Sequence, residues 1–210
     1  MFAPELGPVL GIDPGLSRCG YGAVVRDGAV AQALAAGVIR TDPGAALPDR
    51  LARLAHELEL LLDELQPRAV VVERVLFQVN ARTAIAVGQA SGLALAAAAR
   101  REIPVVQYSP NEVKLAVTGD GAADKAAVQF MVTKLLRLAV APDPPDAADA
   151  LALALCHAWR ERTEYATTSP TQVHDAMPGD RLRARIDAAL AKQAKQATQA
   201  TQAKSRGGAR

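Results

Sequence analysis

Aromatic residues are scarce in this chain of 210 residues, which has three Phe, three Tyr and one Trp. A core with so few rings has to be built from small and branched aliphatic side chains, and half of the residues are apolar. This length and composition are sufficient to bury one sizeable core. We therefore expect one domain with an appendage.

Cysteine and histidine are also few. Cys19 and Cys156 have no partner at metal-ligand spacing, so we expect two free thiols in a reducing compartment and no zinc site. Because free cysteine is usually buried, we expect Cys156 in the core and the adjacent His157 in solvent. The other histidines, His56 and His174, do not complete any recognisable Ser/His/Asp set.

Long hydrophobic runs are absent as well. No stretch of about 18 uncharged apolar residues, the length that crosses a bilayer, occurs in the sequence. The first residues also lack the basic segment before an apolar one that is typical of a secretory signal. The sequence thus predicts a soluble, cytoplasmic protein without membrane contact.

Charge is unevenly distributed, although the net charge is only +2. Residues 176–210 contain eight Lys and Arg against two Asp and Glu, and the rest of the chain contains 16 against 20. A basic tail favours a polyanionic partner, but it is equally typical of a solubilising segment. We expect a folded domain over residues 1–161 and a flexible basic tail over 162–210, disordered or loosely helical because it has little apolar surface.

Two acidic residues end predicted buried strands. The run of Val9, Leu10 and Ile12 ends at Asp13, and the run 69–72 ends at Glu73. Such a carboxylate either opens a turn, as Asp-Pro-Gly commonly does, or is a metal ligand held on a central strand. If the two strands are neighbours, the two carboxylates emerge side by side.

The other hydrophobic patterns predict an α/β fold. Strands are expected at 19–25, 31–40 and 104–108, and helices at 48–66, 80–101, 109–119, 122–138 and from 146 onwards. Asp49 is the expected N-cap of the first helix, and Ser109 to Glu112 form a capping box. Three antiparallel strands followed by alternating helices and strands predict a sheet with helices on both faces.

A second pair of acids, Asp146 and Asp149, opens the last helix. The i, i+3 spacing places both on one face, where they are either an N-cap with a first-turn acid or part of a larger cluster. Together with Asp13 and Glu73 they would form an acidic group that only cations make tolerable. Carboxylate oxygens without His or Cys suit Mg²⁺ or Mn²⁺, and two such ions serve phosphodiester hydrolysis. The pattern therefore indicates a nuclease.

Four motifs carry a resemblance to a known family: LGIDPGLSRCGYG at 10–22, VVERV at 71–75, VGQASG at 87–92 and DAADALA at 146–152. In order and spacing they resemble the bacterial RuvC family of crossover junction endodeoxyribonucleases. The resemblance implies an RNase H-like fold with a five-stranded mixed sheet, Mg²⁺ dependence with two ions per site, and Mn²⁺ as a substitute. It further implies a homodimer that nicks two opposed strands of a four-way Holliday junction in recombination and repair, with the RuvA–RuvB branch-migration complex as partner.

The resemblance also assigns roles to individual residues. It implies that the four catalytic and metal-binding acids are Asp13, Glu73, Asp146 and Asp149. Implied DNA contacts are Lys114, Lys125, Leu76, Phe77, Asn80 and Arg82, and the helix that begins near Asn80 is implied to form the dimer. The family places an aromatic wedge three residues after the strand glutamate, where this chain has Leu76 followed by Phe77. Either residue then supplies the wedge at the branch point.

Three alternatives remain open. The Asp-Pro-Gly loop is similar to the phosphate loop of actin-like ATPases and sugar kinases, which need a second lobe that this chain is too short to form. A nucleic-acid-binding module without catalysis would be favoured by loss of an acid, and all four are present. A related RNase H-like nuclease acting on structured RNA or ribosomal RNA precursors would differ in its substrate.

Overall fold

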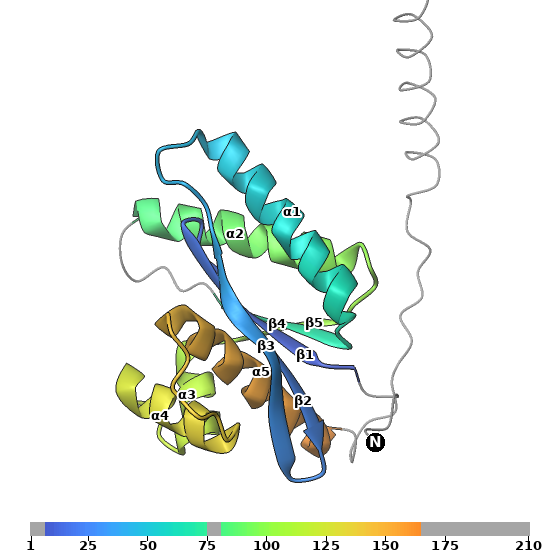
Figure 1. Cartoon of the computed structure of the whole chain (residues 1–210), viewed down its shortest axis with the longest axis vertical. Helices are drawn as coiled ribbons and strands as arrows, with labels where there is room; N and C mark the ends of the chain where they lie inside the picture. The colour runs from blue at the N-terminus through green and yellow to red at the C-terminus, as the bar shows by residue number, and fades with distance from the viewer. Residues whose placement is uncertain (1–6, 75–80, 165–210) are drawn as a thin grey trace, which may run out of the picture. The chain divides into compact units, whose positions relative to one another are not determined.

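The computed structural model describes residues 7–74 and 81–164, and within these ranges the side chains of residues 81, 82 and 162–164 are not described. The strands are β1 (Val9–Asp13), β2 (Arg18–Asp27), β3 (Val30–Arg40), β4 (Ala69–Glu73) and β5 (Val105–Tyr108). The helices are α1 (Leu47–Leu65), α2 (Ala81–Ala99), α3 (Pro110–Thr118), α4 (Lys125–Leu135) and α5 (Pro145–Glu164) (Figure 1).

The five strands form one mixed sheet in the order β3-β2-β1-β4-β5. Neighbours in the β1–β2–β3 meander are antiparallel, whereas β4 is parallel to both β1 and β5. The register pairs Ile12 with Val72, so the ends of β1 and β4 reach the same edge of the sheet. The predicted mixed sheet is confirmed, and the two acid-bearing strands are neighbours, which is the condition for their carboxylates to emerge side by side.

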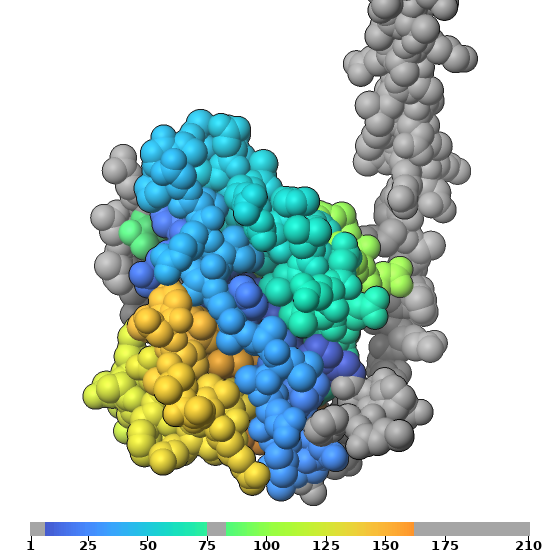
Figure 2. Space-filling model, in the orientation of Figure 1, coloured from blue at the N-terminus to red at the C-terminus, as the bar shows by residue number. Residues whose placement is uncertain are grey.

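Helices cover both faces of the sheet, as predicted (Figure 1). Alternate strand residues point to opposite faces, so Leu10 and Val72 pack with α1 and α2 while Val9 and Val71 pack with α5. The β2–β3 edge lies at the surface between the α1 side and the α4 side (Figure 2). No helix in the two described ranges is long and apolar enough to cross a membrane.

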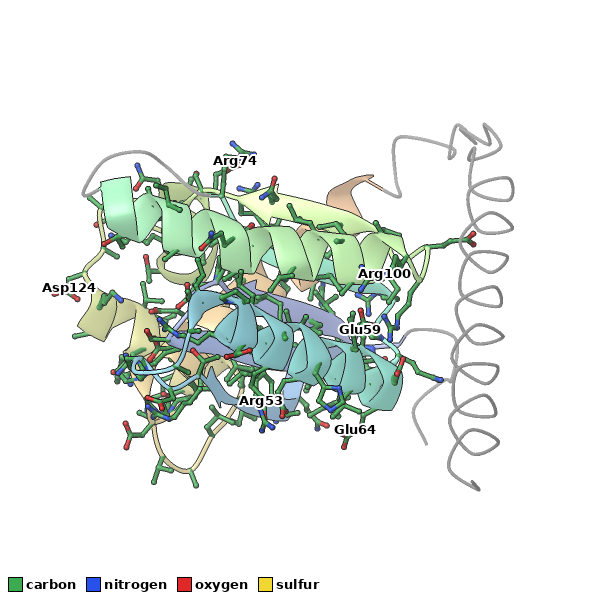
Figure 3. The ribbon with its side chains drawn as sticks, turned by 90° about the horizontal axis from the view of Figure 1, so that it is seen from above. Arg53, Glu59, Glu64, Arg74, Arg100 and Asp124 are labelled. Atoms are coloured by element: carbon green, nitrogen blue, oxygen red, sulfur yellow. The ribbon has the colours of Figure 1, made fainter. Side chains whose placement is uncertain are left out.

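Ion pairs join α1 to the two residues that directly follow α2. The guanidinium of Arg100 pairs with Glu59 (Figure 3), and that of Arg101 pairs with Glu59 and, at 2.7 Å, with Asp63. Burial raises the pKa of Glu59, but the hydrogen bonds from both arginines outweigh it and lower that pKa overall. These acids are therefore satisfied within the fold.

The structure confirms one predicted helix start and corrects two others. The capping box is confirmed, since the Ser109 hydroxyl accepts from the Glu112 amide and the Glu112 carboxylate accepts from the Ser109 amide. The prediction of Asp49 as N-cap is wrong: the N-cap is Ala46, because Pro48 is tolerated inside the first turn and the helix starts one residue before it. The fourth helix starts at Lys125 instead of 122, because Asp124 caps it by accepting from the Ala127 amide at 2.8 Å.

The prediction for the last helix is half correct. Cys156 is buried as expected, but His157 is only 6% exposed and not solvated. The Tyr108 hydroxyl lies 2.9 Å from its Nδ1 and a Glu161 carboxylate oxygen lies 3.1 Å from its Nε2, so the imidazole is buried with both nitrogens partnered. The division of the chain into a domain over 1–161 and a tail over 162–210 stays a prediction. The helix α5 continues to Glu164, and the rest of the predicted tail lies outside the described residues.

Candidate active site

Two carboxylates end adjacent parallel strands. Asp13 is the last residue of β1 and Glu73 the last of β4, and both are partly buried. Together with Asp149 of α5 they line a cavity of about 330 Å³. Two lysines, Lys114 of α3 and Lys125 at the start of α4, complete its polar lining. The sheet and three helices thus bring acids and bases from distant parts of the sequence into one hollow.

Glycines in the strands allow α5 to approach this edge. A Cβ atom on Gly20, which pairs with Asp13 across β1–β2, would lie 2.2 Å from the backbone oxygen of Asp146. A Cβ atom on Gly11 would lie 2.0 Å from the backbone oxygen of Ala150. Both distances are impossible for a real side chain, so α5 rests directly on the strand backbones. The glycine-rich pattern of β1 and β2 is therefore what brings Asp146 and Asp149 beside Asp13.

Crowding of the acids changes their protonation. Burial, then repulsion by Glu73, Asp149 and Asp146, raises the pKa of Asp13 to about 7. Burial and the charge of Asp149 also raise the pKa of Glu73. Carboxylates in a low-dielectric site, close to others of the same charge, resist ionisation unless a cation compensates them. The edge of the sheet therefore carries more negative charge than the fold neutralises.

Two basic side chains compensate part of that charge. Lys125 Nζ lies 3.1 Å from Asp149 Oδ2, and its hydrogen bond to Asp149 raises the pKa of this lysine. An Arg18 guanidinium nitrogen lies 2.6 Å from Asp146 Oδ2. The Lys125 side chain is 83% exposed and that of Arg18 is 49% exposed, so water competes for both bases and they can exchange these carboxylates for other partners. Sequence reasoning missed Arg18, because no periodicity links residue 18 to residue 146.

Of the six predicted site residues whose side chains the structure describes, five lie together and one lies apart. Asp13, Glu73, Asp149, Lys114 and Lys125 line the same cavity. Asp146 is not part of its lining; it lies one helical turn earlier on α5 and pairs with Arg18, although its charge still contributes to the raised pKa of Asp13.

The remaining predicted contacts are not placed. Leu76, Phe77 and Asn80 lie outside the described residues, and Arg82 belongs to the first turn of α2 with its side chain outside them.

The donor set fits a hard divalent cation. In the described ranges no three His, Cys, Asp or Glu side chains are arranged, as they stand, to share one metal ion. The acids at the sheet edge nevertheless supply only carboxylate oxygens, the ligands that Mg²⁺ and Mn²⁺ prefer. Their unneutralised charge, seen in the raised pKa of Asp13 and Glu73, is what such a cation would compensate.

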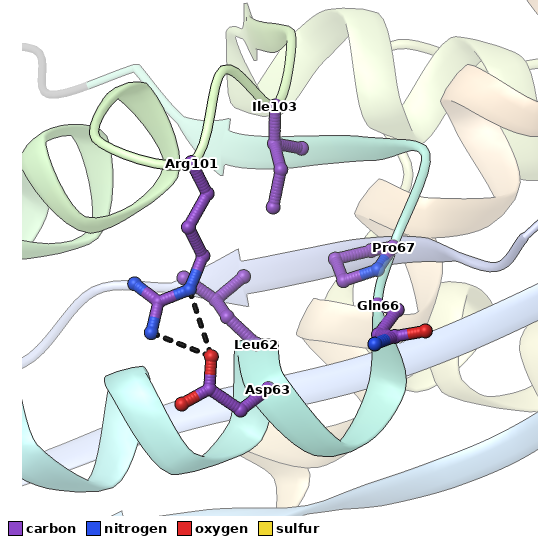
Figure 4. Close-up of a pocket in the computed structure, with 6 residues that line it drawn as sticks. All are labelled: Leu62, Asp63, Gln66, Pro67, Arg101 and Ile103. Atoms are coloured by element: carbon purple, nitrogen blue, oxygen red, sulfur yellow. Dashed lines mark hydrogen bonds and ion pairs between the residues drawn. The ribbon is translucent and has the colours of Figure 1, made fainter.

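A second cavity, of about 510 Å³, lies away from these acids. It is formed by the end of α1 and the segments just before β4 and β5, and its walls include Asp63 and Arg101 (Figure 4). These two side chains already pair with each other. Despite its larger volume this cavity has no converging unpaired acids, so the smaller cavity at the sheet edge is the better candidate for catalysis.

Comparisons with known proteins cover the same region. The family model described as crossover junction endodeoxyribonuclease RuvC matches residues 9–157. A relative of that description from Frankia alni is 56% identical over 155 residues, which cover 72% of this chain and 78% of the relative. Another, from Pseudarthrobacter chlorophenolicus, is 51% identical over 183 residues, covering 86% and 95%.

Solved structures agree. The Thermus thermophilus RuvC in complex with a Holliday junction substrate is 39% identical, has a TM-score of 0.72, and is matched over 75% of this chain and 96% of that one. The yeast mitochondrial Holliday junction resolvase Ydc2 has a TM-score of 0.54 at 15% identity, over 75% and 82% of the two chains, which is a likeness of fold alone. The predicted RNase H-like fold is confirmed.

Proposed function

Because this chain belongs to the RuvC family of crossover junction endodeoxyribonucleases, we propose that it resolves Holliday junctions in DNA recombination and repair. It would do so by hydrolysing one phosphodiester bond in each of two opposed strands. The observation that carries this proposal is the cavity in which Asp13, Glu73 and Asp149 face two lysines. The alternative substrate, structured RNA, is not favoured, since the relatives are described as acting on crossover junctions.

The four acids Asp13, Glu73, Asp146 and Asp149 would hold Mg²⁺, as two ions per site, with Mn²⁺ as a substitute. When bound, the ions would stabilise the attacking and the leaving oxygens of the phosphodiester. The raised pKa of Asp13 supports this assignment, because a carboxyl group that resists ionisation without a counter-charge gains most from a cation.

The protein's own bases would position the DNA. Lys114 and Lys125 border the same cavity as the acids, at a place where a phosphate would meet both charges. Lys125 is exposed and its partner Asp149 is one of the acids, so it can exchange that carboxylate for a phosphate oxygen. These lysines hold and orient the scissile phosphate in the proposal, and the acids do not contact it without a cation.

A second copy of the chain would supply the second cut. One side of α2 exposes Ile85, which is 61% accessible, followed by Gly88 and Gly92, where an added Cβ would meet nothing within 4 Å. Small residues in such a row let two helices approach closely in a symmetric dimer. Sedimentation at micromolar concentration is expected to show a homodimer, and a strict monomer that still nicks both strands in concert would contradict this.

The residues between β4 and α2 would open the branch point. Leu76 or Phe77 is the proposed wedge, with Asn80 and Arg82 as further DNA contacts. Base–aromatic stacking is typically worth about 1–3 kcal/mol, so loss of the correct side chain should weaken branch opening by about tenfold. Fluorescence of 2-aminopurine at the junction centre separates Phe77→Ala from Leu76→Ala, since only the variant that lacks the wedge loses the unstacking signal.

The family context suggests a partner and a place for the reaction. We propose the RuvA–RuvB branch-migration complex as partner and the cytoplasm as location. Co-sedimentation of the three proteins on a synthetic junction tests the partnership, and the absence of any complex containing this chain would contradict it.

The direct test of function is a substrate panel. Purified protein should nick a synthetic four-way DNA junction symmetrically when Mg²⁺ is present and leave it intact in EDTA. Linear duplex DNA of the same sequence and a structured RNA serve as controls. Equal cleavage of the duplex, or cleavage of the RNA in preference to the junction, would contradict the proposal.

A further inference from the structure

The turn that joins β1 to β2 is held by a residue outside it. Thr41, the residue after β3, donates from its hydroxyl to the backbone oxygen of Leu16 at 2.5 Å and from its amide to that of Ser17 at 3.2 Å. Thr41 is only 7% exposed, so these bonds are made where water competes little. The turn is therefore fixed at two successive carbonyl groups.

Arg50 of α1 also binds this turn, through Thr41 and Ser17. Its Nε donates to the Thr41 hydroxyl oxygen at 3.1 Å, and a terminal nitrogen donates to the Ser17 hydroxyl at 2.6 Å. The Thr41 hydroxyl thus accepts from Arg50 while it donates to Leu16. One planar guanidinium connects α1, the end of β3 and the turn, in a geometry that a flexible ammonium does not reproduce.

The turn itself carries two groups of the active site. Asp13 ends the strand just before it, and Arg18, which pairs with Asp146, begins the strand just after it. The turn is tight, since a Cβ atom on Gly15 would lie 2.1 Å from the backbone oxygen of Arg18. A shift at Leu16 or Ser17 therefore also moves Asp13 and Arg18.

We propose that Arg50 is a positioning residue for the nuclease site, acting through Thr41 and the 14–17 turn on Asp13 and on the Arg18–Asp146 pair. This rests on the proposed function. Arg50 does not line the cavity that contains the acids, so it acts at a distance from the reacting atoms. A misplacement of about 1 Å at a catalytic group can reduce the rate about 100-fold.

A direct phosphate contact is the competing role for Arg50. With Arg40 and Arg53 it lines a surface cavity of about 310 Å³, which a DNA backbone could follow. Two of its donors, however, are already directed at Thr41 and Ser17. Arg53 lies on the same helix, is more exposed and pairs with Glu57 in its i, i+4 position, so Arg53→Ala is the matched control for loss of positive charge.

The experiment measures single-turnover nicking at saturating junction, junction affinity and amide hydrogen exchange of residues 14–18. Arg50→Ala and Thr41→Val should each slow nicking by about 100-fold, with junction affinity changed by less than about threefold. Both should also speed exchange in the turn. Arg50→Lys should not restore the rate, Thr41→Ser should restore most of it, and the double variant should be no slower than either single one.

Three outcomes would overturn the proposal. Weaker junction binding at an unchanged nicking rate in both Arg50→Ala and Arg53→Ala would make Arg50 a phosphate contact. Lower thermal stability with a normal nicking rate would make its role purely structural. Unchanged amide hydrogen exchange of the turn in Arg50→Ala would show that Arg50 does not hold the turn in place. Failure of the wild-type protein to nick the junction would instead contradict the proposed function, and the exchange measurement would still decide whether Arg50 holds the turn.

Discussion

Acidic side chains are compensated at one end of the central strands and crowded together at the other. Where β1 and β4 end, Asp13, Glu73 and Asp149 crowd together, and the pKa of Asp13 is raised to about 7 by burial and by its acidic neighbours. Where β4 begins, Arg68 pairs with Glu161 and donates to the backbone oxygen of Gly7 at 2.6 Å. Burial there also raises the pKa of Glu161, but hydrogen bonds from His157 and Arg68 outweigh it and lower that pKa to about 2.

The two groups of acids differ in their effect on the stability of the fold. At the start of β4 the acid is satisfied by the fold and contributes to its stability. At the end of β4 the acids cost stability, and a protein retains such a cost where the groups are needed for binding or chemistry. Acids whose pKa is raised and whose charge the fold does not fully compensate therefore distinguish the candidate site from the paired acids elsewhere.

The largest effect is expected from removing one of the crowded charges. Asp13→Asn keeps the side-chain volume but removes a charge that a divalent cation requires, so nicking should fall by at least about 10³-fold. Junction affinity should be unchanged or higher, because repulsion of the phosphates decreases. A quantitative junction-cleavage assay with a parallel binding assay measures both, and a nicking rate close to wild type would refute the metal-site assignment.

The same substitution should stabilise the cation-free protein. Because the pKa of Asp13 is raised from 3.8 to about 7 in the folded state, wild-type stability falls as pH rises between these values. Above pH 7, Asp13→Asn should therefore be more stable by about 2–4 kcal/mol in EDTA, with the difference lost near pH 4. Urea unfolding at several pH values checks this, and a destabilised variant at pH 8 would contradict it.

The next largest effect concerns the distance between α5 and the sheet. Gly20→Ala places a methyl group against the backbone oxygen of Asp146, so the start of α5 has to move away. We expect a loss of about 1–3 kcal/mol in stability and of about 100-fold in nicking rate. Gly44→Ala is the control, since its nearest atom would lie 3.4 Å from the new methyl group. Equal rates in both variants would show that the close approach is not required.

Local patterns were sufficient to predict the strands, the capping box and the positions of Asp13 and Glu73 at strand ends. They failed where a contact depends on tertiary packing. His157 looks like a surface residue in the sequence, and only the positions of Tyr108 and Glu161 explain its burial. Arg18 and Arg50 likewise gain their partners through the fold, 128 and 33 residues away. Their roles therefore could not be predicted from spacing along the chain.

A smaller effect is expected where β4 begins, at the paired carboxylate of Glu161. Glu161→Gln should lower stability by about 1–3 kcal/mol at pH 7, because a carboxylate whose pKa is depressed stabilises the fold wherever it is ionised. The difference from wild type should shrink as pH falls from 4.5 towards 2, where the wild-type carboxylate becomes protonated. Nicking should stay within about threefold of wild type, since Glu161 is remote from the reacting atoms. A pH-independent difference in unfolding free energy would argue against this ionic role.

The smallest effect is expected for Arg100→Ala. The Arg100 side chain is 60% exposed and its partner Glu59 keeps a second arginine, Arg101. Surface ion pairs typically contribute about 0–1 kcal/mol and weaken with salt. Thermal unfolding should differ from wild type by at most about that amount, and less in 1 M salt. A larger, salt-independent loss would show that the fold depends on the pair more than its exposure indicates.

Calorimetric titration with Mn²⁺ at pH 8 tests most directly whether the crowded acids at the ends of β1 and β4, and not the paired Glu161 where β4 begins, bind a cation. Wild-type protein and Glu161→Gln should bind Mn²⁺ with the same affinity, and Asp13→Asn should bind it at least about tenfold more weakly. That result would place cation binding at the end where β1 and β4 finish. Equal affinity for all three proteins would contradict the claim that the crowded carboxylates form the metal site.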